Sequence, residues 1–167
     1  MAKVFEEALV SCVSTAILAC AVWFALSLSG YYPLFWLVSF VTGLVGVTMA
    51  YVCASIAPNT EYAIISCAGL NTMLLFFVGL LIRFEDIPAY WKWLVYINHL
   101  HYGWGALMKN QFNTTDLVGP FGIPVLEYFD LDGSATAWDY LGYEIIFIVV
   151  FFIIGCVAMR FINYGRR

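Results

Sequence analysis

The sequence predicts an all-α integral membrane protein with four transmembrane helices, one re-entrant helical segment and one external loop. Two features of composition support this fold class. The 167 residues are 63% hydrophobic and only 11% charged, whereas about a quarter of the residues of a soluble domain are charged. Long stretches also contain no charged residue at all. Membrane lipids are therefore the expected surroundings.

Each predicted span is long enough to cross the hydrocarbon layer. A helix of about 20 apolar residues reaches across roughly 30 Å. The predicted spans cover residues 8–29, 34–57, 62–82 and 141–160. The first three contain no charged residue, and Glu144 interrupts the fourth close to its start. Short connections rich in turn-forming residues predict that the first three spans are antiparallel neighbours.

Residues 88–109 are apolar enough to enter lipid but fit a full crossing poorly. The segment begins at Pro88, directly after a charged stretch, and it is dense in Tyr and Trp. These aromatic residues favour the headgroup level of a bilayer. We predict a broken helical pair that dips into the membrane and returns to the same side. The alternative is a fifth crossing, which would move one terminus to the outside.

Residues 112–139 are predicted to form the external loop. The loop contains several acidic residues and no Lys or Arg, and Asn113 begins an acceptor sequence for N-glycosylation. Basic residues lie instead at Lys3 and in the tail after the last span. The excess of positive charge on cytoplasmic segments therefore places both termini in the cytoplasm.

The third span has a distinctive face. Helical spacing groups Ala68, Asn71, Thr72, Leu75 and Gly79 on one broad side that is small and mildly polar. Such a side either packs against another helix or lines a substrate cavity, and the residues alone leave both interpretations open.

Three ionisable side chains near the spans invite a functional interpretation. An acid inside a span is by default a functional hypothesis, but Glu144 lies near the end of its helix, so we expect it to face water or to pair with Lys92 or Lys109. His99 and His101 are two residues apart, and on a helix they point in different directions. We predict bonds to backbone or water rather than a shared metal.

The chain lacks the motifs of common catalysts. It has no Gly-rich loop ending in Gly-Lys-Ser/Thr for phosphates, and no paired acids, Ser–His pair or zinc motif at membrane depth. We predict no catalytic or metal-binding residue in this chain, and no nucleic acid as a partner.

Three runs of sequence resemble the membrane domain of G-type ATP-binding-cassette exporters, the white and pleiotropic-drug-resistance group. They are Phe77-Val-Gly-Leu-Leu-Ile-Arg-Phe, Ile87-Pro-Ala-Tyr-Trp-Lys-Trp and His101-Tyr-Gly-Trp-Gly-Ala-Leu-Met-Lys-Asn-Gln-Phe112. In that family the end of the fifth membrane helix precedes a re-entrant segment and a helix that ends in Asn-Glu-Phe. The resemblance extends from about Glu6 to the end. It implies that the four spans correspond to the third to sixth helices of an ABC-2 type domain.

The resemblance implies ATP-driven export of a lipidic or amphipathic compound through a cavity between two membrane domains. It implies that Thr72 and Leu75 face that cavity, and that Leu80 and Leu81 form a hydrophobic plug above it. ATP and Mg²⁺ would bind to a partner nucleotide-binding domain. The chain departs from the family pattern at Gln111, where the family has Glu.

The resemblance also sets expectations about the whole protein. The family's nucleotide-binding domain, first two membrane helices and coupling helix have no counterpart in these residues. We therefore expect a fragment, a truncated product or one piece of a split transporter, located in the plasma membrane. The alternative is a non-transporting membrane scaffold or accessory protein, in which the small-residue face of the third span merely packs helices.

Overall fold

The computed structural model describes residues 2–112 and 123–161, and its regular elements are all helical over these ranges. The predicted all-α class is therefore confirmed. The elements are α1 (Ala2–Leu26), α2 (Tyr32–Ile56), α3 (Thr60–Phe76), the 3₁₀ turn η1 (Phe84–Asp86), α4 (Lys92–Ile97), α5 (His99–Gln111), α6 (Val125–Tyr128) and α7 (Ala137–Phe161).

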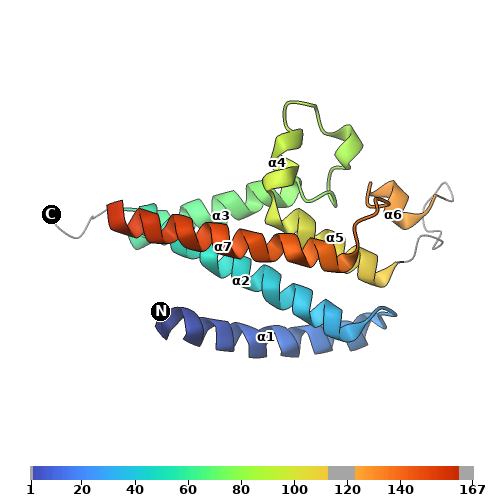
Figure 1. Cartoon of the computed structure of the whole chain (residues 1–167), viewed down its shortest axis with the longest axis horizontal. Coiled ribbons are helices and arrows are strands. Elements are labelled where there is room, and N and C mark those ends of the chain that lie inside the picture. Colours follow the sequence, from blue (N-terminus) through green and yellow to red (C-terminus); the bar gives the residue numbers. More distant parts are fainter. Residues whose placement is uncertain (1, 113–122, 162–167) are drawn as a thin grey trace.

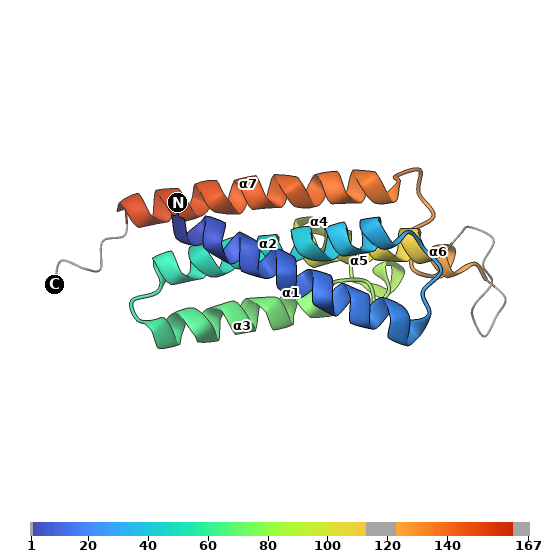
Figure 2. The same ribbon diagram turned by 90° about the horizontal axis from the view of Figure 1, so that it is seen from below.

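Helix α2 is the centre of the assembly. It contacts α1, α3, α5 and α7, and Figures 1 and 2 show these helices arranged around it. The core is formed by Leu34, Val38 and Val41 of α2 with Ala106 of α5 and Leu141 of α7. The start of α1, the α2–α3 turn and the end of α7 lie at one end of the molecule, and the α1–α2 turn and α6 lie at the other (Figure 2).

Three of the described helices are long and apolar enough to cross a membrane: Glu6–Leu26 within α1, Tyr32–Ile56 and Ala137–Phe161. Helix α7 begins four residues before the predicted span because Thr136 and Asp139 cap it. The Thr136 amide donates to Asp139 Oδ2 at 2.7 Å, and the Asp139 amide donates to Thr136 Oγ1 at 3.4 Å. These reciprocal bonds satisfy amides that the first helical turn leaves free.

The third predicted span differs most from expectation, because α3 ends at Phe76 rather than at residue 82. Side chains from α5 and its N-cap bind the backbone where the helix stops. Asn98 Nδ2 donates to the Leu74 carbonyl at 2.7 Å, and His101 Nδ1 lies 2.8 Å from the Val78 carbonyl. Gly79 then adopts φ +103°, which glycine tolerates readily, and the chain turns away. The prediction that His101 binds backbone at a broken helix is confirmed.

Helix α5 runs beside only part of α7. At the start of α5, the His99 ring lies 6.4 Å from that of Phe147 and 6.2 Å from that of Phe151, near the middle of α7. At the end of α5, Lys109 lies over Tyr140, in the first turn of α7. The 13 residues of α5 rise about 20 Å. Helix α5 therefore begins at mid-height of the bundle and ends level with the start of α7.

Hydrogen bonds connect the end of α5 to the α1–α2 turn. The Gly30 amide donates to Gln111 Oε1 at 3.2 Å, and the Tyr31 amide donates to Asn110 Oδ1 at 3.1 Å. Asn110 Nδ2 returns a bond to the Tyr31 carbonyl at 3.2 Å. Asn110 and Gln111 therefore join the end of α5 to the turn between α1 and α2.

Gly103 allows α2, α5 and α7 to meet closely. A Cβ atom at this position would lie 2.6 Å from Thr42 Oγ1 of α2 and 2.6 Å from Glu144 Oε1 of α7. Real Cβ atoms do not approach other atoms so closely, so a side chain at residue 103 would force the Thr42 and Glu144 side chains, or their helices, to shift.

We predict that Gly103→Ala destabilises the protein, although alanine favours helix formation. Overpacking at this contact should lower the free energy of unfolding by about 1–3 kcal/mol. Gly142→Ala is the matched control, because Gly142 lies in α7 with open space around its Cβ position. Thermal denaturation of both variants in detergent, followed by circular dichroism, measures the difference. Equal melting temperatures for the two variants would show that Gly103 is not a close-contact position.

We also predict that Asn98→Leu loosens the junction between α3 and α5. The buried Asn98 side chain donates to the Leu74 carbonyl and accepts from the Leu100 amide. Leaving such buried groups unpaired costs about 1–3 kcal/mol each. Hydrogen–deuterium exchange of the Leu100 amide should become faster, whereas Asn59→Leu, at the exposed α2–α3 turn, should leave it unchanged. Unchanged exchange in Asn98→Leu would contradict the capping role.

Candidate functional site

Helix α3 has one packed side and one open side. Its half-buried residues Ala63, Cys67, Asn71 and Leu74 recur at helical spacing, and α2 is the long helix against which α3 packs. No residue of α3 is fully buried. Figure 2 shows α3 at the edge of the assembly. The other side of α3 is therefore uncovered by the described part of this chain.

The structure separates the four residues predicted to line a cavity. Thr72 and Leu75 lie on the open side, and Leu75 is 49% exposed. Asn71 lies on the packed side, where its amide donates to the Cys67 carbonyl at 3.1 Å. Gly79 lies beyond the helix end and is buried, with the Trp104 ring 3.5 Å from its Cβ position. The helical spacing that placed Gly79 with Thr72 ends at Phe76.

Thr72 gives the open side of α3 a polar group whose hydrogen atom is not free to bind a ligand. Thr72 Oγ1 donates to the Ala68 carbonyl at 2.9 Å, so its hydrogen atom is already used within the helix. Leu80 and Leu81, the predicted plug, follow Gly79 and are 52% and 58% exposed. The chain thus places two exposed leucines just beyond the end of an open helix face.

The predicted surroundings of Glu144 were wrong. It does not face water or pair with a lysine, because it is fully buried and its Oε1 lies 2.7 Å from Thr42 Oγ1. Thr42 Oγ1 also lies 2.9 Å from the Val38 carbonyl. The Thr42 hydroxyl, which has one hydrogen to donate, thus lies within hydrogen-bond distance of two acceptors, the Glu144 carboxyl and the Val38 carbonyl.

The two lysines expected near Glu144 are engaged elsewhere. Lys92 Nζ lies 4.6 Å above the Phe84 ring, and Lys109 Nζ donates to the carbonyls of Gly133 and Ala135. The pKa of the Lys109 ammonium is lowered by burial, and the charges of Asp132 and Asp139 offset only part of this effect.

The two histidines point in different directions, as predicted, but among the described residues the buried Nδ1 of His99 has no hydrogen-bond partner, so the predicted bond to backbone or water is found for His101 and not for this atom. His101 points to the end of α3, whereas His99 is buried against the aromatic rings of α7. Among residues 2–112 and 123–161, no three His, Cys, Asp or Glu side chains gather closely enough to hold a metal. Asn113, the predicted glycosylation site, lies outside the described residues.

Two cavities among the described residues adjoin α3 or α5, and neither was anticipated from the sequence. One, of about 440 Å³, lies between α4, α5 and α7 and is lined mainly by Phe84, Tyr96, Tyr102, Tyr140 and Tyr143. We call it the tyrosine cavity. It draws on separate segments of the chain, so no local pattern in the sequence could have indicated it.

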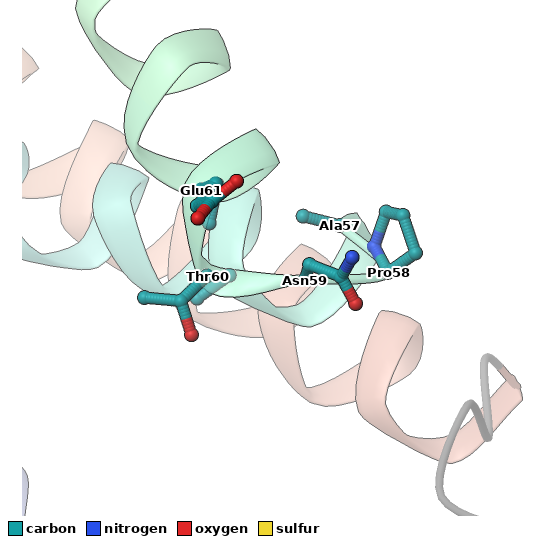
Figure 3. Close-up of a pocket in the computed structure, with 7 residues that line it drawn as sticks. Ala57, Pro58, Asn59, Thr60 and Glu61 are labelled. Atoms are coloured by element: carbon teal, nitrogen blue, oxygen red, sulfur yellow. The ribbon is translucent and has the colours of Figure 1, made fainter.

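The other cavity, of about 630 Å³, lies at the α2–α3 turn. Its lining includes Pro58, Asn59, Thr60 and Glu61, which Figure 3 shows along the connection between the two helices. It is an exposed hollow at the opposite end of α3 from Leu75. It therefore contributes nothing to the open face on which Thr72 and Leu75 lie.

Comparisons with known proteins agree with this architecture. Residues 1–112 match the family described as ABC-2 type transporter. A protein of Petunia hybrida called ABC transporter G family member STR2 is 26% identical over 93% of this chain and 23% of its own length. The ABC transporter ATP-binding protein/permease wht-1 of Caenorhabditis elegans is 31% identical over 54% of this chain and 14% of its own length.

The chain thus spans less than a quarter of the length of these relatives. The family match covers α1 to α5, including the broken end of α3 and the Asn-Gln contact with the α1–α2 turn. The overlap with the G-family relatives continues through most of the chain. This chain therefore belongs to the ABC-2 type transporter family, as a G-type membrane domain.

Proposed function

We propose that this chain is the membrane-spanning permease part of an ATP-driven exporter of lipidic or amphipathic compounds. Family membership supports a transport role, and the name of the Caenorhabditis elegans relative joins an ATP-binding protein to a permease. A nucleotide-binding domain would hold ATP and Mg²⁺. A second membrane domain, identical or different, would complete the substrate path in the plasma membrane.

The open face of α3 carries this proposal. The exposed side of α7 bears bulky apolar residues such as Ile146, Val149 and Ile153, which suit lipid chains. The open face of α3 also exposes bulky residues, Ile65 and Phe76 among them, but it intersperses them with the small side chains Ala68 and Thr72. Small residues let another helix approach closely. This mixture supports a role for α3 at the boundary with a second membrane domain, where a substrate cavity would lie.

The proposed mechanism is differential burial of an apolar ligand. The ligand would rest against Thr72 and Leu75 while Leu80 and Leu81 close the path on the side where α7 begins. Rearrangement of the two membrane domains, driven by ATP on the partner, would separate the leucines and expose the ligand outward. This chain would supply shape and apolar surface, and the chemistry of hydrolysis would occur elsewhere.

The same proposal includes a topology. Both termini would be cytoplasmic, α3 would be the third of four crossings, and residues 88–109 would re-enter the membrane. The start of α1 and the end of α7 at one end of the molecule support it (Figure 2). The start of α5 at mid-height beside Phe147 supports re-entry.

We predict saturable photo-crosslinking at Leu75. A benzophenone amino acid at this position should capture tritiated lipids or lipophilic drugs, and excess unlabelled compound should abolish capture. Val149 is the control, because it is similarly exposed on α7. It also lies between Phe147 and Phe151, whose rings contact His99 at the start of α5, so it is at a similar height in the bundle. Crosslinking from Val149 should resist competition, because membrane lipid there does not exchange at a specific site.

Equal, non-competed crosslinking from Leu75 and Val149 would contradict the substrate role. It would favour a non-transporting scaffold, in which α3 packs against another helix. Competed crosslinking at Leu75 would exclude that alternative.

A further inference from the structure

The tyrosine cavity is separate from the open face of α3. It lies at the end of the molecule where α7 begins, since Tyr140 and Tyr143 belong to the first two turns of that helix. Its volume of about 440 Å³ is in the range of small-molecule sites. In the proposed topology this end is at the level of the lipid headgroups, where tyrosine is enriched in membrane proteins.

The rings of the cavity form one cluster. The Tyr102 ring centroid lies 5.3 Å from that of Tyr143 and 6.0 Å from that of Tyr140. Tyr140 and Tyr143 meet nearly at right angles, at 87°. Aromatic faces carry negative electrostatic potential, and several faces around one space attract a cation without hydrogen bonds.

The surroundings of the cavity already show this attraction. Lys92 Nζ lies 4.6 Å from the centre of the Phe84 ring, and Lys109 Nζ lies 5.3 Å from that of Tyr140. The carboxylate-bearing Asp130 also lines the cavity. The Tyr102 hydroxyl donates to the Tyr96 carbonyl at 3.1 Å, which removes one donor that could have bound a ligand. The wall thus offers aromatic side chains and the Asp130 carboxylate to an occupant.

We propose that the tyrosine cavity binds a quaternary ammonium group. Such a cation has no N–H to donate, so ring faces and a nearby carboxylate recognise it better than hydrogen-bond acceptors do. Lys92, which lies over the Phe84 ring of the cavity wall, suits a phosphate attached to the same ligand. Choline carries this chemistry, either within a lipid headgroup or as a free molecule.

The test uses the full chain with its native cysteines replaced by alanine and Ala135, which lines the cavity, replaced by cysteine. The alkylation rate of this cysteine is measured in nanodiscs of phosphatidylglycerol. Saturating choline should slow alkylation at least about threefold more than 3,3-dimethylbutanol, which has the same shape without the charge. Equal effects of the two compounds, or no effect of either, would overturn the proposal.

Lipid composition distinguishes the two sources of choline. If a lipid headgroup is the occupant, alkylation in phosphatidylcholine nanodiscs should already be slow before choline is added. If the occupant is a free cation, the starting rate should be the same in both lipids and choline should slow both. Either result supports recognition of the quaternary ammonium group.

Variants locate the binding to the rings. Tyr143→Leu should remove the protection by choline, and Tyr143→Phe should retain it. Trp138→Leu is the matched control, since Trp138 is an exposed aromatic residue of the same helix outside the cavity lining. Asp130→Asn should weaken protection while keeping a residue that tolerates the positive φ of 57°. Equal protection in Tyr143→Leu and Trp138→Leu would overturn the assignment.

Discussion

The fold depends on how the backbone at the end of α3 is satisfied. A helix that stops in apolar surroundings leaves carbonyl groups without partners, and each unpaired group is costly where water is scarce. From more than 20 residues later in the chain, His101 binds the Val78 carbonyl, and Asn98 adds a second donor to the Leu74 carbonyl, which also accepts from the Phe77 amide at 3.0 Å. This bonding fixes where α3 ends and where α5 begins. It thereby sets the height in the bundle at which α5 begins.

The placement of α5 then determines the contacts of the other helices. With its start held at α3, α5 brings Gly103 between Thr42 and Glu144. Its end reaches the α1–α2 turn, where Asn110 and Gln111 bind backbone amides. One short helix therefore connects the central helix α2, the last helix α7 and a distant turn. The side of α3 that faces away from this assembly is left uncovered, and the proposed substrate path lies there.

Features of the fold that depend on local composition could be predicted from the sequence. Uninterrupted apolar runs indicated the long helices, and the aromatic residues around Asn98 indicated a broken segment. The end of α3 could not be predicted, because its cause is a bond from a residue distant in sequence. The burial of Glu144 was missed for the same reason, since its neighbours Thr42 and Gly103 come from other helices. Asn71 and Thr72 are adjacent in sequence, but only packing against α2 reveals which of them is on the open side.

The central claim is that residues 88–109 turn back instead of crossing, and labelling with a membrane-impermeant maleimide tests it most directly. Single cysteines are placed at Ala89, Ser134 and Asn59, which are all exposed, in a chain whose native cysteines are replaced by alanine. The account predicts that Ala89 and Ser134 are labelled from outside intact cells, and that Asn59 is labelled only after permeabilisation. Labelling of Ala89 and Ser134 from opposite sides of the membrane would contradict it.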